Sequence, residues 1–109
     1  MIYHITTKEE WENGKKKGYY TASSLETEGF IHCSEERQVK GVLERYDLFK
    51  KDLLKLVIDP QKLNSELKYE MAPSVNENFP HVYGPINLDA VIDVQNLKNN
   101  SGSRLSSRL

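Results

Sequence analysis

The stretch LLKLVID, residues 53–59, is the most pronounced strand pattern in this chain of 109 residues. Leucine, valine and isoleucine dominate it, and Pro60 follows directly. Proline cannot continue the hydrogen-bond ladder of a sheet, so the strand ends there. We therefore expect residues 53–59 to form the central strand of the fold.

The first part of the chain predicts a strand and a short helix. Residues 2–6 have a strand-like pattern, and Thr7 and Glu10 then have the spacing of a capping box, in which each satisfies a backbone donor of the other. Trp11 is the expected apolar anchor of the helix that follows. Residues 14–18, two glycines around three lysines, are expected to end it.

The next part predicts two strands and a second helix. Residues 19–21 and 30–33 are rich in strand-forming side chains, and the polar residues 23–29 are expected to connect them as a loop. Ser34 precedes two glutamates, as expected of a helix N-cap. The apolar residues of this helix repeat at intervals of three and four, at Val39, Val42, Leu43 and Tyr46.

The remainder of the chain predicts strands only. These are expected at residues 67–71, 82–86 and 90–94. Residues 72–78 are expected to form a polar loop, and residues 87–89 a turn. We thus expect one α+β domain over residues 1–97, with residues 98–109 as a disordered tail or an artificial extension of the natural chain.

Composition excludes several classes of protein. The formal net charge is −1, so no excess of positive charge favours duplex nucleic acid as a partner. No apolar run approaches the roughly 20 residues that span a bilayer, and no secretory signal is visible. The single cysteine, Cys33, excludes an internal disulfide, and we expect a cytoplasmic protein.

All three histidines lie in short apolar segments that are expected to be strands, although charged residues make up 28% of the chain. They are His4, His32 and His81. Histidine donates and accepts protons near neutral pH, so three copies drawn into the interior indicate a candidate site. We expect them to converge at one solvent-reachable cavity.

The alternation of side chains along a strand predicts which neighbours share a face with His32. Phe30 and Ser34 share it, whereas Ile31 and Cys33 point the other way. Cys33 is therefore expected to be a small buried hydrophobe instead of a reactive thiolate. His32 and Ser34 beside a helix N-terminus suit a phosphate or another anion; alternatively, His32 bonds a backbone carbonyl and Ser34 only caps the helix.

The same alternation pairs the other two histidines with polar neighbours. His4 shares a face with Thr6, and this pair suits a ligand hydroxyl or amide; the alternative is a satisfied structural histidine. His81 shares a face with Tyr83, and both rings are expected to line the same cavity.

Several motifs together resemble the bacterial domain of unknown function 952 over about residues 1–97. They are YHIT at 3–6, YTAS at 20–23, GFIHCS at 29–34, LVID at 56–59, KYE at 68–70 and FPHVYGP at 79–85. The resemblance implies a fold like that of ADP-ribosyltransferases, a split sheet of two small antiparallel halves with about two helices around a cleft. It implies no settled activity.

The resemblance also suggests roles for individual residues. By motif order, His4 matches a first-strand position that contacts ribose and the nicotinamide amide, and Ser34 or His32 matches the middle position. The late position falls on His81, with Glu70 as a weaker candidate. ADP-ribosyltransferases often have a glutamate there, so a histidine departs from ordinary mono-ADP-ribosylation.

A related branch, the RNA 2′-phosphotransferases, uses arginines and histidines instead of that glutamate. The arginines of this chain all fall outside the strand motifs, so the match is partial. They are Arg37, Arg45, Arg104 and Arg108.

Three functions remain open. The first is a small transferase or hydrolase acting on NAD or a related nucleotide, with His4 at the ribose, His32 and Ser34 at the phosphate or amide, and His81 as acid, base or orienter; His81 and His4 are its candidate catalytic residues. The second is a binding module that holds a nucleotide-like ligand in the cleft without catalysis. The third is a metal site formed by the three histidines.

Overall fold

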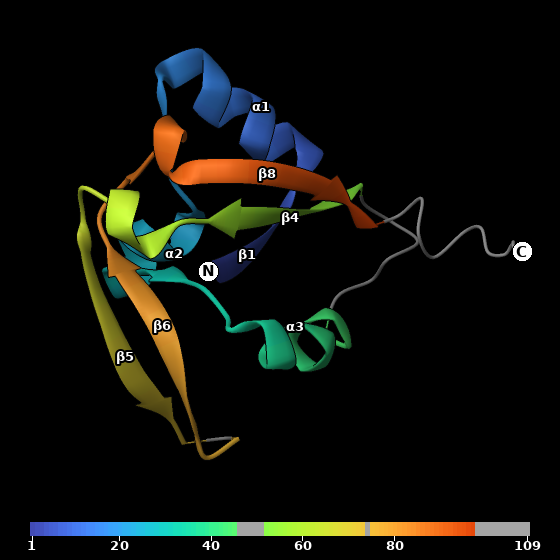
Figure 1. Ribbon diagram of the computed structural model, residues 1–109, viewed down its shortest axis with the longest axis vertical. Helices are drawn as coiled ribbons and strands as arrows, with labels where there is room; N and C mark the ends of the chain where they lie inside the picture. Colours follow the sequence, from blue (N-terminus) through green and yellow to red (C-terminus); the bar gives the residue numbers. More distant parts are fainter. Residues whose placement is uncertain (46–51, 74, 98–109) are drawn as a thin grey trace, which may run out of the picture.

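The computed structural model describes residues 1–45, 52–73 and 75–97, and within them the strands form three antiparallel sheets (Figure 1). The helices are α1 (Lys8–Lys17), α2 (Ser23–Glu28) and α3 (Glu36–Leu43). The strands are β1 (Ile2–Thr7), β2 (Tyr19–Tyr20), β3 (Ile31–His32), β4 (Leu53–Ile58), β5 (Glu66–Ala72), β6 (Glu77–Tyr83), β7 (Ile86–Asn87) and β8 (Val91–Asn96). The α+β class expected from the sequence is confirmed.

The strand at residues 53–58 is central, as expected. β4 lies between β1 and β8 and pairs antiparallel with both. Leu53 and Leu54 point to opposite faces of the strand, yet both are buried. Burial on both faces explains why the sequence of β4 is almost continuously apolar instead of alternating.

The second three-stranded sheet has the order β3-β6-β5, and the third sheet is the short pair β2-β7. One backbone bridge connects the first two sheets: the N–H of Tyr3 donates to the carbonyl of Ser34 at 2.8 Å, and the N–H of Ser34 donates to the carbonyl of Tyr3 at 2.7 Å. This bridge places the end of the GFIHCS motif against β1, which carries His4. Two motifs far apart in the sequence thereby lie side by side.

The β5–β6 hairpin extends away from the β1-β4-β8 sheet, and α3 faces it (Figure 1). The side chain of Gln38 on α3 donates to the carbonyl of Asn78 at 2.9 Å and to the Glu77 carboxylate at 3.1 Å. These bonds hold α3 at a defined distance from the hairpin. Residues of α3 and of the hairpin line one cavity together with residues of β1 and α2.

Residues 23–28 form the helix α2, and the expectation of a loop for residues 23–29 was wrong. The segment is a single short, mostly polar helix whose Leu25 packs against the core. Gly29 ends it with φ of +90°, a conformation that glycine adopts readily. One apolar residue in six is too weak a periodic signal to indicate a helix.

The ends of the other two helices also differ from expectation. Gly14 lies inside α1 and does not end it: a Cβ there would lie 3.1 Å from the Cα of Tyr20, so glycine allows β2 to approach. Gly18 ends the helix. The N-cap of α3 is Glu35, not Ser34, because the backbone of Ser34 is paired with β1.

Two further expectations concern the end of the chain. Strand β6 begins at Glu77, inside the segment expected to be a loop, because that segment closes the β5–β6 hairpin. Tyr46 and residues 98–109 lie outside the described residues. In the described part of the chain, no helix has the length and apolarity needed to cross a membrane.

Candidate functional site

A single cavity of about 660 Å³ is lined by all three histidines. It lies between β1, α2, the GFIHCS segment, α3 and the β5–β6 hairpin, and its wall also includes Ser34 and Phe79. Ligand cavities in proteins typically have volumes of about 300–1,000 Å³. The convergence expected from the sequence is therefore present, but the three rings have different surroundings.

The ring of His4 is buried and both of its nitrogens have partners. Nδ1 lies 2.6 Å from the carbonyl oxygen of His32, and because a carbonyl only accepts, Nδ1 carries the proton. Nε2 lies 2.8 Å from the hydroxyl of Tyr20. The wall thus includes the His4 ring, but neither nitrogen is available to a ligand.

The partners of His4 continue as a chain of hydroxyl groups. The Tyr20 hydroxyl lies 2.7 Å from Oγ1 of Thr6, and Thr6 donates to the Glu10 carboxylate at 3.2 Å. Burial lowers the pKa of His4 from 6.5 to about 4, despite the bond to the His32 carbonyl and the nearby Glu10 charge. His4 is therefore neutral at neutral pH, and its ring has a structural role: it connects the His32 carbonyl with the Tyr20 hydroxyl.

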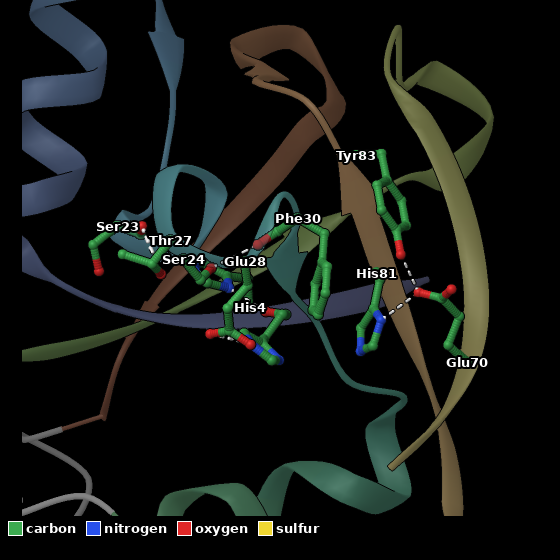
Figure 2. Close-up of polar contacts among 10 residues, drawn as sticks. His4, Ser23, Ser24, Thr27, Glu28, Phe30, Glu70, His81 and Tyr83 are labelled. Carbon is green, nitrogen blue, oxygen red and sulfur yellow. Dashed lines mark hydrogen bonds and ion pairs between the residues drawn. The ribbon is translucent and has the colours of Figure 1, made fainter.

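His81 is also buried, with 7% of its surface exposed, but within the described part of the chain only one of its nitrogens is engaged. Nδ1 lies 2.7 Å from Oε1 of Glu70, and Tyr83 donates a hydrogen bond to the same oxygen (Figure 2). Nε2 lies on the opposite edge of the ring from Glu70 and has no partner among the described residues. A carboxylate accepts only, so Nδ1 carries the proton and Nε2 of the neutral ring offers a lone pair.

Electrostatics keep Glu70 ionised. Hydrogen bonds from Tyr83 and His81 lower its pKa, and the Glu70 carboxylate in turn raises the pKa of Tyr83. The ring of Phe30 stacks on His81 with centroids 4.0 Å apart and planes at 14° (Figure 2). The imidazole is thereby fixed in orientation as well as in tautomer.

His32 is the exposed member of the three, with 53% of its side chain accessible. It lies opposite His81 in the β3–β6 register, and the two ring centroids are 5.4 Å apart. Its Nε2 is 3.1 Å from both carboxylate oxygens of Glu28 on α2. His32 is therefore the solvent-facing histidine of the cavity wall.

Ser34 and Cys33 are both buried in the wall of the cavity. The hydroxyl of Ser34 has no hydrogen-bond partner among the described residues. Burial raises the pKa of Cys33 to about 12, so the group is a thiol at neutral pH. Cys33 and Ile31 both belong to the core cluster, as the strand alternation predicted.

Two of the predicted binding residues, Thr6 and Tyr83, do not line the cavity. Thr6 contacts His4 through Tyr20, and Tyr83 contacts His81 through Glu70. Ser34 is not the N-cap of the helix that was expected beside His32 and Ser34, because α3 begins beyond Ser34 and is capped by Glu35.

Sequence reasoning missed the roles of three residues in these clusters. They are Tyr20, Glu10 and Phe30. Glu10 was identified only as a capping residue, which it also is, since its N–H donates to Thr7 Oγ1 at 3.1 Å. A signal existed for Phe30, because it shares a strand face with His32.

A site for a metal ion finds no support in the described ranges, where no three histidine, cysteine or acidic side chains are grouped to hold one. The physical reason is that His4 has both nitrogens engaged. Only His32 and His81 of the three remain as possible ligands, and His32 is paired with Glu28.

The fold and the cavity define a small α+β protein with a histidine-lined site. The chain belongs to the family described as Protein of unknown function (DUF952), whose profile matches residues 5–94. It is similar in structure to protein CC0527 from Caulobacter crescentus: the crystal structure has a TM-score of 0.78 and 26% sequence identity, covering 87% of this chain and 83% of that one. The solution NMR structure of CC0527 has a TM-score of 0.72 and 23% identity, covering 96% of this chain and 97% of that one. Among curated proteins, none matches significantly.

Proposed function

We propose that the cavity binds a nucleotide-like small molecule, with NAD or a related nucleotide as the leading candidate, and that His81 is the acid or base of a transfer or hydrolysis reaction. One observation carries the proposal: the buried His81 ring has Nδ1 held by Glu70 and leaves Nε2 without a partner among the described residues. A carboxylate that orients an imidazole in this way is a recurrent feature of general acid–base sites.

Two buried polar groups without a partner among the described residues support the binding of a ligand at this position. Buried polar groups in native proteins nearly always have a hydrogen-bond partner, and an unsatisfied one needs an explanation. His81 Nε2 and the Ser34 hydroxyl are two such atoms within the described residues, and both side chains line the same cavity. A bound molecule that offers one donor to Nε2 and one polar atom to Ser34 satisfies both.

The shape and composition of the cavity favour a nucleotide. Phe79 and Met71 supply apolar surface for a flat ring, and Ser23 and Ser24 lie in the wall on the side of α2. Arg45 provides a cation for a phosphate group. The family resemblance noted in the sequence implies a fold like that of ADP-ribosyltransferases, and this adds an argument by analogy for a nucleotide in the cleft.

His81 and Glu70 have separate tasks in the proposed reaction. Nε2 takes a proton from water or from a hydroxyl group of the second substrate, and the resulting imidazolium is stabilised by the Glu70 carboxylate. Glu70 does not line the cavity, and its Oε1 accepts hydrogen bonds from His81 and Tyr83. It therefore acts through the imidazole and does not contact the ribose.

A non-catalytic binding module is the second candidate, and one observation favours it. The wall contains no activated nucleophile among the described residues, because Cys33 is a protonated thiol and Ser34 has no hydrogen bond to a base. Such a site is able to hold a ligand without forming a covalent intermediate. Attack by water then remains the available route for catalysis.

Thermal unfolding with NAD, ADP-ribose, AMP and nicotinamide tests the proposal. A ligand at 100 times its Kd stabilises the native state by about 2.7 kcal/mol, so binding raises Tm. We expect one or more of these compounds to raise the Tm of the wild type but not of His81→Gln, with Tyr69→Phe on the neighbouring strand as the matched control. Chromatography of the nucleotide after incubation separates the two candidates, since only an enzyme consumes it. No shift with any compound would contradict both.

A further inference from the structure

We propose that Tyr83 is a positioning residue of this site, which acts on His81 through the Glu70 carboxylate and weakens the basicity of Nε2. The inference deepens the proposed function and rests on it for its catalytic meaning. The sequence suggested instead that Tyr83 lines the cavity beside His81. Tyr83 is absent from the cavity wall, and its hydroxyl contacts Glu70.

The geometry that carries the proposal is the sharing of one oxygen atom. His81 Nδ1 and the Tyr83 hydroxyl both donate to Oε1 of Glu70 (Figure 2). Two donors on one oxygen divide its negative charge between them. The hydroxyl of Tyr83 therefore reduces the stabilisation that Glu70 gives to a protonated His81.

Other elements also face this cluster. Lys68 on β5 is the register partner of His81, and its Nζ lies 5.0 Å from the centroid of the Tyr83 ring. His32 on β3 contacts the His81 ring edge-on and is itself paired with Glu28 on α2. Tyr83→Phe keeps the ring under Lys68 and removes only the hydroxyl. It therefore isolates the hydrogen bond from the packing.

The shift in the pKa of Glu70 is consistent with this arrangement. The hydrogen bond from Tyr83 is the largest cause that lowers it, ahead of the one from His81. Removal of the hydroxyl is expected to return the pKa of Glu70 toward its ordinary value and to strengthen the hydrogen bond between the carboxylate and His81.

NMR titration of the purified protein without ligand tests the inference, with the carboxyl carbon of Glu70 and the ring nitrogens of His81 as probes. In Tyr83→Phe, we expect Glu70 to protonate at higher pH than in the wild type and the His81 ring to titrate at higher pH. In Glu70→Gln, which removes the charge, we expect the His81 ring to titrate at lower pH. Tyr69→Phe, which alters another tyrosine of the hairpin, is expected to leave both unchanged.

Equal titration of His81 in the wild type and in Tyr83→Phe would overturn the inference. A shift in the same direction for Tyr83→Phe and Glu70→Gln would overturn it as well, because the two changes act oppositely on the charge at Oε1. If Tyr83→Phe does not fold, the amide resonances reveal it, and the expected downward shift in Glu70→Gln still tests the coupling of the carboxylate to His81. These measurements need no ligand, so they fail or succeed independently of nucleotide binding. With a bound nucleotide, the pH profile of binding or turnover is expected to move upward in Tyr83→Phe.

Discussion

The surroundings of His4 and of His81 differ, although both rings are buried and both line one cavity. His4 has a partner on each nitrogen, Tyr20 and the carbonyl of His32, and burial lowers its pKa to about 4. His81 has one partner, Glu70, and leaves Nε2 unengaged among the described residues. Burial and position on the wall therefore do not distinguish the two rings; the difference is an unused nitrogen beside an oriented partner, which is what a general acid or base requires.

The largest expected effect is on catalysis by His81, whose Nε2 has no partner among the described residues. If the protein is an enzyme, His81→Gln is expected to lower turnover of the nucleotide by about 10²–10⁴-fold, the usual contribution of a general acid or base. His4→Gln is the matched change at the histidine whose two ring nitrogens both have partners, and it is expected to retain most of the activity of the folded protein. Steady-state assays at equal native concentration measure both. Equal losses in the two variants would remove the distinction.

For the free energy of unfolding, we expect a change at His4 to have a larger effect than a change at His81. His4→Ala removes the hydrogen bond to the His32 carbonyl and the contact with the Tyr20 hydroxyl and leaves a void at a buried position, so we expect it to reduce the free energy of unfolding by about 2–4 kcal/mol. His81→Ala removes the hydrogen bond to a partly exposed carboxylate and the stacking on Phe30, but Glu70 keeps its hydrogen bond from Tyr83, so this change is expected to cost less. Urea unfolding of the two variants provides the measurement. A larger loss for His81→Ala would contradict the assignment of His4 as the structural histidine.

The pH dependence of the free energy of unfolding tests the burial of His4. His4 has a pKa near 6.5 in the unfolded chain and about 4 in the native protein. Between these values the unfolded state binds more protons, so stability decreases as the pH falls from about 6.5 to about 4, by at most about 3 kcal/mol. His4→Gln is expected to flatten this part of the curve in urea unfolding at a series of pH values. An unchanged slope would mean that His4 is not the buried group responsible.

The smallest expected effect is at Cys33. Because its thiol is buried and protonated, Cys33→Ala is expected to leave nucleotide binding unchanged and to reduce the free energy of unfolding by only about 1 kcal/mol. Native protein is also expected to resist alkylation by iodoacetamide until it unfolds. Selective loss of turnover in Cys33→Ala would instead place the thiol in the reaction.

Much of the fold follows from local patterns. The apolar run at residues 53–59 predicted the central strand, and the alternation around His32 predicted that Cys33 is buried. The exposure of His32 was not predicted, because all three histidines were expected in the interior. Helix α2 was missed because its six residues contain one apolar anchor, Leu25. Ser34 was misread as a cap because its backbone pairing with Tyr3 joins segments 31 positions apart, which no local pattern reveals.

The amino-acid sequence by itself indicated most of the strand segments and which side chains share a face of each strand, because the periods of strands and helices are local properties of the chain. The meeting of the three imidazoles at one cavity depends on how distant segments pack. Tertiary structure alone decided which imidazole keeps an unused nitrogen. Tyr20 and the carbonyl of His32 reach His4 from 16 and 28 positions away, and Glu70 reaches His81 from a neighbouring strand 11 positions away. Hydrogen bonds of this kind depend on how strands pair and sheets pack, and the sequence pattern around each histidine carries no record of them.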